Sequence, residues 1–336
     1  MTSPAVSLLL AVRNEERFLP AALASIFRQS LPNWELVVVD DGSTDRTPEI
    51  LAQARQTYPD KIHVVKQTAL GLVDALNLGL EKCRAPLVAR MDGDDICHPQ
   101  RLFAQHAYMQ HHPEVAVVSC QIRHFPRPQL SEGMKTYEAW QNSLLTHDDI
   151  QRDRYVESPL THPSVMYRRQ AVLAAGGYRE LPWAEDYDLW LRLIRAGARF
   201  ARLPGTLFYW RDRPDRLTRT AANCTLTAMR DCKIHYLCQD YLRGQREVTL
   251  WGAGLEGKAW RKVLLRQGIH VARWVDIDPR KVGQTIHGAP VIAPTELRTD
   301  QGKMLITVGA AGARQQIRQW ADRNGFKDQH DFICVT

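Results

Sequence analysis

Four short apolar runs recur along the first 91 residues, separated by polar segments with helical spacing. The runs have the length of a strand buried on both faces, and they cover residues 6–12, 34–39, 62–65 and 87–91. The segments between them begin near residues 19, 47 and 71 and repeat apolar side chains every three or four positions. Strands that alternate with helices of this length predict βαβ units and a mostly parallel sheet.

Beyond residue 91 the alternation of apolar runs and helical segments is less regular. It predicts a helix over residues 99–112 and a strand over 115–119, whereas residues 121–159 lose periodicity and collect proline, glutamine and charge. A long irregular segment of this kind indicates a functional loop or a lid. Strand character resumes at residues 162–167, and later segments predict two short strands and one long helix, at 200–203, 206–210 and 221–242.

The strand–helix pattern restarts near residue 248. A short apolar run there is followed by Gly252-Ala-Gly254-Leu-Glu-Gly257, a helical segment and a second strand that ends at Asp276. This is G-x-G-x-x-G between a strand and a helix, with an acidic residue about 20 positions further on. At about 90 residues, the unit fits a shortened Rossmann-like module better than a dehydrogenase domain. The module either binds a nucleotide at Gly252, Gly254, Gly257 and Asp276, or has kept the fold as a docking domain.

Carboxylates follow two of the predicted parallel strands. One strand ends in Asp40 and Asp41, and another in Asp92, with Asp94 and Asp95 directly after Gly93. Because neighbouring parallel strands end at the same edge, both clusters should line one crevice. Two carboxylates one residue apart can share a hard divalent cation, which commonly also holds phosphates. The alternative for the D-x-D pair is a solvated acidic turn.

Two later clusters of charged residues could also take part in catalysis or in phosphate binding. Glu185, Asp186 and Asp188 stand in the first turn of an amphipathic helical segment. They either interact favourably with the helix dipole or include a general base beside the crevice. A basic patch follows, which could contact phosphate or be solvated, and it contains Arg211, Arg213, Arg216 and Arg219.

Composition narrows the class of protein. The 336 residues are 44% hydrophobic and 24% charged, as in an ordinary globular protein of two domains. A net charge of +7 suits anionic substrates or an anionic membrane surface but is too small to indicate nucleic-acid binding. Seven cysteines without a C-x-x-C pair favour reduced thiols. No signal core or run of about 18 apolar residues is present, so we expect a cytoplasmic protein, soluble or peripheral on the inner face of the membrane.

Four motifs in this order resemble the family 2 glycosyltransferases of the GT-A fold. They are Ser7-Leu-Leu-Leu-Ala-Val-Arg-Asn-Glu15, Val37-Val-Val-Asp-Asp-Gly-Ser-Thr-Asp45, Arg90-Met-Asp-Gly-Asp-Asp95 and Ala184-Glu-Asp-Tyr-Asp-Leu-Trp190. The resemblance covers roughly residues 5–220. It implies an α/β GT-A nucleotide-diphospho-sugar transferase domain over residues 1–220. The helical pattern and the polar segment after it predict a connecting helix and linker over 221–246. The small Rossmann-like domain would occupy residues 247–336.

The resemblance also implies roles for individual residues. The reaction would be an inverting transfer from a nucleotide-diphosphate sugar with Mg²⁺ or Mn²⁺, with Asp94 as the direct metal ligand and Asp92 nearer the ribose or metal. Asp186 matches the carboxylate proposed as base, and Glu185 is its neighbour. The positions that would contact the nucleotide sugar are Ala11, Arg13, Glu15, Asp41, Asn77, Arg90 and Asp92.

The chain departs from the family pattern at two places. Many relatives have Arg-Asn in the helix after the third strand, where this chain has Leu76-Asn77. Many also place a histidine after the last strand, where Asp212-Arg213-Pro214 stands here. The first difference removes an arginine that would contact a phosphate or the base. The second removes a third metal ligand or a diphosphate contact, although Arg213 could replace the charge.

The resulting hypothesis is a glycosyltransferase that acts on a glycan or lipid-linked acceptor in bacterial surface polysaccharide synthesis. The alternatives are a nicotinamide-dependent oxidoreductase built on the 252–257 loop, a nucleotidylyltransferase, and a catalytically silent protein whose C-terminal domain binds a nucleotide or a partner. The sequence shows no Tyr-Lys or His-Asp partners near the 252–257 loop and no glycine-rich basic loop after the first strand. Neither enzymatic alternative is therefore favoured.

Overall fold

The computed structural model describes residues 3–336, which form two compact units. The N-terminal unit consists of the chain up to Ile150 together with Pro159–Thr220. The C-terminal unit consists of Gln151–Ser158 and Ala221–Thr336. Both units combine helices with a mainly parallel sheet, so the α/β class is confirmed.

The first half of the N-terminal unit contains the predicted βαβ units. Its elements are β1 (Val6–Val12), α1 (Leu19–Phe27), β2 (Trp34–Asp41), α2 (Thr47–Thr57), β3 (Ile62–Gln67), α3 (Leu72–Lys82) and β4 (Leu87–Asp92). Strand β1 pairs in parallel with both β2 and β4. Ala11 lies opposite Val39 on one side and Asp92 on the other, so the three strands end at one edge of the sheet.

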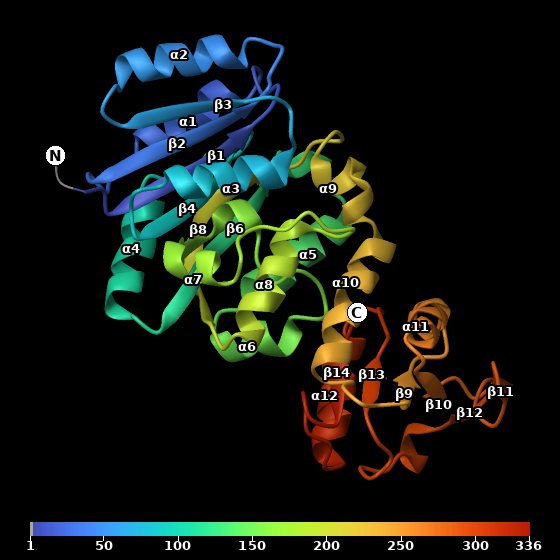
Figure 1. The fold of residues 1–336 in the computed structure, drawn as a ribbon. Helices are drawn as coiled ribbons and strands as arrows, with labels where there is room; N and C mark the ends of the chain where they lie inside the picture. The colour runs from blue at the N-terminus through green and yellow to red at the C-terminus, as the bar shows by residue number, and fades with distance from the viewer. Residues whose placement is uncertain (1–2) are drawn as a thin grey trace. The chain divides into compact units, whose positions relative to one another are not determined.

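Burial on both faces explains why these strands read as continuous apolar runs. Leu8 and Leu10 pack in a core that includes residues of α1 and α2, whereas Leu9 packs in a second core with residues of α3. Helices α1 and α2 therefore cover one face of the sheet and α3 the other, as Figure 1 shows. Each strand thus alternates between two hydrophobic layers.

The second half of the unit extends the sheet with antiparallel pairs. Its elements are β5 (Ile96–Cys97), α4 (Arg101–His111), β6 (Val115–Phe125), the 3₁₀ turn η1 (Arg127–Gln129), α5 (Glu132–Ser143), α6 (His147–Asp153), η2 (His162–Ser164), β7 (Met166–Arg168), α7 (Arg169–Ala174), α8 (Glu185–Arg195), β8 (Arg199–Arg211) and α9 (Leu217–Thr220). The order of the eight strands is β3-β2-β1-β4-β7-β6-β8-β5. Strand β7 is antiparallel to both β4 and β6.

Three sequence predictions for this region and the following helix are wrong. Residues 121–159 are not an irregular loop, because β6 continues to Phe125 and α5 and α6 follow. The two strands expected at 200–203 and 206–210 form the single strand β8, whose pairing with β6 shifts register near Gln121. The helix expected over 221–242 is divided into η3 (Ala222–Cys224) and α10 (Leu226–Gln239), where the hydroxyl of Thr225 caps α10.

The C-terminal unit has a six-stranded sheet in the order β11-β12-β10-β9-β13-β14. After η3 and α10, its elements are β9 (Glu247–Trp251), α11 (Leu255–Arg266), β10 (His270–Val275), β11 (Thr285–Ile286), β12 (Ala289–Ile292), η4 (Pro294–Glu296), β13 (Met304–Ile306), α12 (Ala313–Arg323) and β14 (Phe332–Cys334). All pairs are parallel except the β11–β12 hairpin. Across residues 3–336 we find no helix with the length and apolar character needed to cross a bilayer.

The segment Gln151–Ser158 is held within the C-terminal unit by buried charges. The carboxylate of Asp153, 3% exposed, lies 2.6 Å from Nη2 of Arg318 and 3.5 Å from Nη1 of Arg314. The buried ammonium of Lys233 donates hydrogen bonds to the carbonyl oxygens of Val156 and Val335. This segment, which includes the last three residues of α6 and precedes η2 in sequence, is thereby part of the C-terminal core.

Candidate active site

Three carboxylates converge where β4 ends. Asp92 is the last residue of the strand, and Asp94 and Asp95 lie in the turn to β5. One carboxylate oxygen from each residue lies within 4.8 Å of the others. Gly93 is required in this turn because a Cβ there would lie 2.9 Å from Cγ1 of Val12. The turn therefore packs directly against the end of β1.

Arginine side chains surround this acidic cluster. The buried Arg90 places Nη2 2.6 Å from Oδ1 of Asp92. Arg213 places Nη2 2.5 Å from Oε1 of Glu15 and Nε 3.1 Å from Oδ2 of Asp94. The loop after β8 thus brings a cation to two acids that come from the loops after β1 and β4.

Arg211 fixes the turn through its backbone and its side chain. Its backbone N–H donates to Oδ1 of Asp95 at 2.7 Å, and its Nε donates to the carbonyl oxygen of Asp94 at 2.6 Å. The guanidinium also lies over the rings of Phe18 and Phe125. These contacts hold the two aspartates at fixed positions at the end of the sheet.

The ionised forms of these acids are costly in the protein alone. Burial and the charge of Asp94 raise the pKa of Glu15 to about 7. Burial and Asp92 raise the pKa of Asp94, and burial and Asp94 raise that of Asp95 well above its usual range. Oδ2 of Asp95 is buried without a hydrogen-bond partner. Such an oxygen-rich set of acids fits a hard divalent cation, which would offset their mutual repulsion.

The loops after β1 and β2 form one surface beside the cluster. The backbone N–H of Asn14 donates to the hydroxyl of Ser43 at 3.0 Å, and that of Glu15 donates to Oγ1 of Thr47 at 2.8 Å. Ala11 lies at the end of β1 and Arg13 is exposed in the loop that follows. The structure therefore brings these two residues to the same edge as Glu15 and Asp92.

Asp41 and Asn77 use their side chains within the fold. Oδ1 of Asp41 accepts from Nε2 of Gln67 at 2.6 Å and from the backbone N–H of Leu70 at 2.8 Å, and Oδ2 accepts from that of Gly71 at 3.1 Å. The Asn77 amide donates to the carbonyl oxygen of Tyr178 and accepts from its N–H, both at 2.9 Å. Asp41 thus fixes the start of α3, and Asn77 links α3 to the turn after α7.

Glu185 and Asp186 form a coupled pair at the start of α8. Burial and the charge of Glu185 raise the pKa of Asp186 to about 8. Burial also opposes ionisation of Glu185, but the contact with His162 outweighs it and lowers the Glu185 pKa. The pKa values of the two neighbouring carboxyls are therefore driven apart: Glu185 is ionised at neutral pH, whereas Asp186 loses its proton only near pH 8. Asp188 instead pairs with Arg192 inside the fold, 2.7 Å away.

Arg90 lies between the acidic cluster and this pair. Its guanidinium is ion-paired with Asp92, and its charge also favours the ionised forms of Glu185 and Asp186, although burial and the charge of Glu185 keep the pKa of Asp186 raised. A buried cation on β4 thus acts on carboxylates of both segments. Sequence reasoning named Asp95 among the carboxylates after the strand but gave it no role in the site, and it missed His162, for which no local pattern gives a signal.

The candidate residues of the C-terminal unit lie around the β9–α11 loop. Oδ2 of Asp276 accepts from the backbone N–H of Ala253 at 3.0 Å and from Nζ of Lys281 at 2.8 Å. Oδ1 accepts from the N–H of Asp278 at 3.0 Å. The acid that would bind a ribose in a dinucleotide site therefore already stabilises the glycine loop and the segment after β10.

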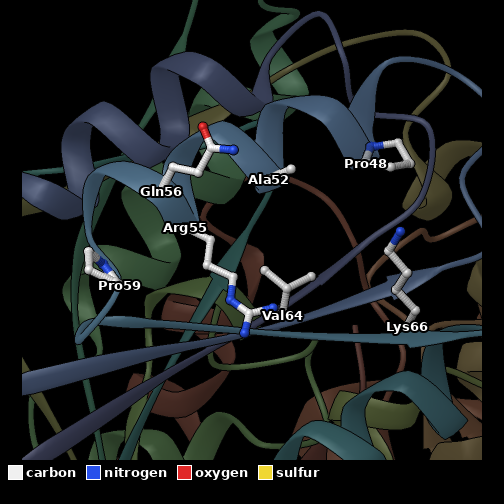
Figure 2. A pocket seen from close by; sticks show the side chains of 7 residues that line it. All are labelled: Pro48, Ala52, Arg55, Gln56, Pro59, Val64 and Lys66. Carbon is white, nitrogen blue, oxygen red and sulfur yellow. The ribbon is translucent and has the colours of Figure 1, made fainter.

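A separate hollow lies between α2 and β3, as Figure 2 shows. Its lining residues are Pro48, Ala52, Arg55, Gln56, Pro59, Val64 and Lys66. None of them is a carboxylate or a candidate site residue. We therefore place the chemistry at the acidic edge of the sheet.

Comparisons with known proteins agree with this geometry. The sequence model described as Glycosyl transferase family 2 matches residues 7–174. Amylovoran biosynthesis glycosyltransferase AmsE of Erwinia amylovora is 34% identical over 215 residues, which cover 63% of this chain and 78% of AmsE. The curated match thus leaves about a third of this chain uncovered.

Two solved structures share the fold. S. aureus TarS 1–349 in complex with UDP-GlcNAc superposes with a TM-score of 0.56 at 18% identity, covering 78% of this chain and 72% of that one. The mannosyltransferase PcManGT from Pyrobaculum calidifontis, in complex with GDP-Man and Mn²⁺, gives 0.52 at 20% identity, covering 80% and 70%. At these identities the similarity establishes a shared fold.

Proposed function

Because this chain belongs to glycosyl transferase family 2 and is therefore a glycosyltransferase, we propose that it is an inverting enzyme with a nucleotide-diphosphate sugar as donor. The acceptor is a glycan or a lipid-linked sugar of a surface polysaccharide. AmsE, a glycosyltransferase named for amylovoran biosynthesis, supports a biosynthetic role of this kind. The net charge of +7 suits an anionic diphosphate donor and an anionic membrane surface at which a lipid-linked acceptor would be met.

The observation that carries the proposal is the convergence of Asp92, Asp94 and Asp95 at the end of β4. Asp94 and Asp92 would hold Mg²⁺ or Mn²⁺, and the unpartnered Oδ2 of Asp95 lies within the same cluster. When bound there, the cation neutralises negative charge on the diphosphate leaving group. PcManGT, of the same fold, binds Mn²⁺ together with GDP-Man.

Asp186 is the general base of the proposed reaction. It takes the proton of the acceptor hydroxyl as that oxygen attacks the anomeric carbon from the side opposite the diphosphate. A pKa near 8 makes the carboxylate a much stronger base than an exposed aspartate, with about a tenth of it ionised at pH 7 and half at pH 8. The loop after β1, which carries Arg13 and Glu15, and the loop after β2 would border the nucleotide.

The C-terminal unit is, in this proposal, a Rossmann-like docking module. The internal hydrogen bonds of Asp276 support docking over a dinucleotide site, because the carboxylate would have to leave Ala253 and Lys281 to bind a ribose. The nicotinamide-dependent alternative therefore has no specific observation in its favour.

The decisive experiment screens nucleotide sugars against the full chain. Thermal shift with UDP-, GDP- and dTDP-sugars, with and without Mn²⁺, should find a donor whose stabilisation depends on the metal, and a radiolabelled form of that donor should be transferred to lipid-linked acceptors. Asp94→Asn should abolish the metal-dependent shift, whereas Asp60→Asn, at an exposed position, should keep it. The proposal fails if no nucleotide sugar gives a metal-dependent shift, or if Asp94→Asn behaves as the wild type.

A further inference from the structure

His162 occupies a buried position beside the proposed base. It begins η2, and its side chain is 8% exposed. The turn is held from several sides, since the Ser164 hydroxyl donates to the carbonyl oxygen of Thr161 at 2.7 Å and Nε2 of Gln105 donates to that of Ser164 at 2.8 Å. The ring edge packs against Trp190 on α8. The imidazole is therefore fixed in place by rigid elements.

Both ring nitrogens of His162 face a specific partner. Nε2 lies 3.0 Å from the hydroxyl oxygen of Tyr178, and Nδ1 lies 3.6 Å from Oε1 of Glu185. An ionised carboxylate can only accept a hydrogen bond, so the proton of a neutral imidazole belongs on Nδ1. Nε2 then accepts from the Tyr178 hydroxyl at 3.0 Å, a shorter contact than the 3.3 Å between the hydroxyl oxygens of Tyr178 and Tyr167. Tyr178 is itself held by Asn77 through its backbone, which completes a chain of contacts from α3 to α8.

We propose that His162 is a positioning residue for the transfer reaction: through Nδ1 it keeps the Glu185 carboxylate ionised and oriented beside Asp186. This inference depends on the proposed function of Asp186 as base. The geometry gives Tyr178 the role of fixing the imidazole tautomer, and Asn77 the role of fixing Tyr178. None of the three touches the substrate in this account.

The surrounding charges favour this arrangement. Burial and the nearby Arg90 lower the pKa of His162, so the ring stays neutral, while its contact lowers the pKa of Glu185. The charge kept on Glu185 in turn raises the pKa of Asp186. The titratable and charged groups that face the imidazole and the carboxyl pair come from β4, β7, the turn after α7 and α8. They are Arg90, Asp92, Tyr167, Tyr178, Glu185 and Asp186.

Two substitutions separate the functions of the ring nitrogens. Asn places its amide nitrogen near the position of Nδ1 and can donate to Glu185, whereas Gln reaches the position of Nε2 and can contact only Tyr178. Without a donor to Glu185, burial raises the pKa of that carboxyl and neutralises it. The like charge beside Asp186 is then lost, and the pKa of Asp186 falls.

The test is the pH dependence of kcat/KM on the donor that the screen identifies. We expect kcat/KM of the wild type to rise with pH to a plateau above about 8, and we call this rise the limb of the pH profile. In His162→Gln the limb should lie about one pH unit lower. At the plateau, kcat of this variant should be about tenfold lower. His162→Asn should keep the limb within about 0.3 units of the wild type. KM for the donor should be unchanged in both variants.

Failure of this inference differs from failure of the proposed function. If transfer occurs but His162→Gln lowers activity at every pH without moving the limb, His162 has only a structural role and the inference is overturned. If no donor is turned over, the proposed function itself fails. Histidine ¹⁵N spectra of the full chain give a readout without substrate, where we expect a neutral, Nδ1-protonated ring. A ring that is Nε2-protonated or charged at pH 7 would overturn the inference.

Discussion

Nε of Arg213 lies 3.1 Å from Oδ2 of Asp94, so the chain supplies its own cation to the residue proposed as the direct metal ligand. The same guanidinium contacts Glu15 and lies 5.3 Å from the ring centroid of Phe18. Arg213 stands in the segment where many family members have a histidine. A guanidinium and a divalent ion at this position compensate the same carboxylate. We therefore expect Arg213 and a divalent ion to compete for the Asp94 carboxylate.

Removing this arginine should strengthen metal binding to the protein without nucleotide. We expect Arg213→Gln to increase Mn²⁺ affinity about tenfold, because a nearby positive charge is lost from the acidic cluster. Isothermal titration with Mn²⁺ alone measures the effect. Arg28→Gln, at an exposed position, removes the same charge and should leave the affinity unchanged. Unchanged or weaker Mn²⁺ binding in Arg213→Gln would contradict the competition.

Glu15 should make the metal-free protein less stable as pH rises toward neutrality. Burial, reinforced by Asp94, raises its pKa from 4.5 to about 7, so the folded chain binds more protons than the unfolded chain between these values. Its contribution therefore lowers the free energy of unfolding as pH rises from about 4.5 to 7, and becomes constant above that range. Glu15→Gln should flatten this part of the stability profile in EDTA. Glu180→Gln, at an exposed position, is the control.

Asp186→Asn should stop transfer without weakening donor binding. General-base help contributes about 10²–10⁴-fold, and we expect kcat to fall by that factor because an amide cannot accept the acceptor proton. The wild-type rate should rise with pH until about 8, as Asp186 loses its proton. Titration with the donor and Mn²⁺ checks binding separately. A loss of donor affinity equal to the loss in rate would make Asp186 a binding residue.

The parallel half of the N-terminal unit could be predicted because its strands are buried on both faces. Such strands leave continuous apolar runs, which the sequence displays at β1, β2 and β4. Helix α5 was missed because its inward face includes polar groups. Gln141 is fully buried there, and it accepts a hydrogen bond from the Thr161 hydroxyl and another from Arg202. A helix that buries hydrogen-bonded polar side chains gives only a weak apolar period.

The residues of the candidate site could likewise be predicted from the sequence only in part. The acids could be identified because they stand in short motifs that follow strands. The contact of Arg213 with Glu15 joins residues 198 positions apart, and the contact of His162 with Glu185 depends on the packing of η2 against α8. Neither contact has a local pattern in the sequence. The use of the Asp41 carboxylate to hold the start of α3 could likewise be seen only in the structure.

Asp153 should be a major source of stability for the C-terminal unit. Replacing it with asparagine removes the counter-charge of Arg314 and one of the two carboxylates that pair with Arg318, which keeps Asp328; since both arginines are partly exposed, we expect a loss of about 2–3 kcal/mol. Hydrogen exchange followed by mass spectrometry on peptides from α12 and β14 measures the opening free energy of this unit in the full chain. Asp300→Asn, at an exposed position of the same unit, should have no effect. Equal exchange in both variants would contradict the proposed importance of the Asp153 cluster.

The glycines of the 252–257 loop should differ sharply in their tolerance to alanine. A Cβ on Gly257 would lie 1.9 Å from the carbonyl oxygen of Gly252 and 3.0 Å from Cζ3 of Trp274, so the helix and strand would have to separate. We expect Gly257→Ala to cost about 3 kcal/mol or more.

Gly254→Ala is the matched control, because Gly254 has a negative φ of −91° and no atom within 4 Å of an added Cβ. It should change stability by less than about 0.5 kcal/mol. The same exchange measurement on peptides from β9 and α11 compares the two variants. This contrast would show that the third glycine is needed for packing of the α/β unit whether or not the loop binds a nucleotide. Equal effects of the two substitutions would mean that the close approach of α11 to β9 is not what Gly257 provides.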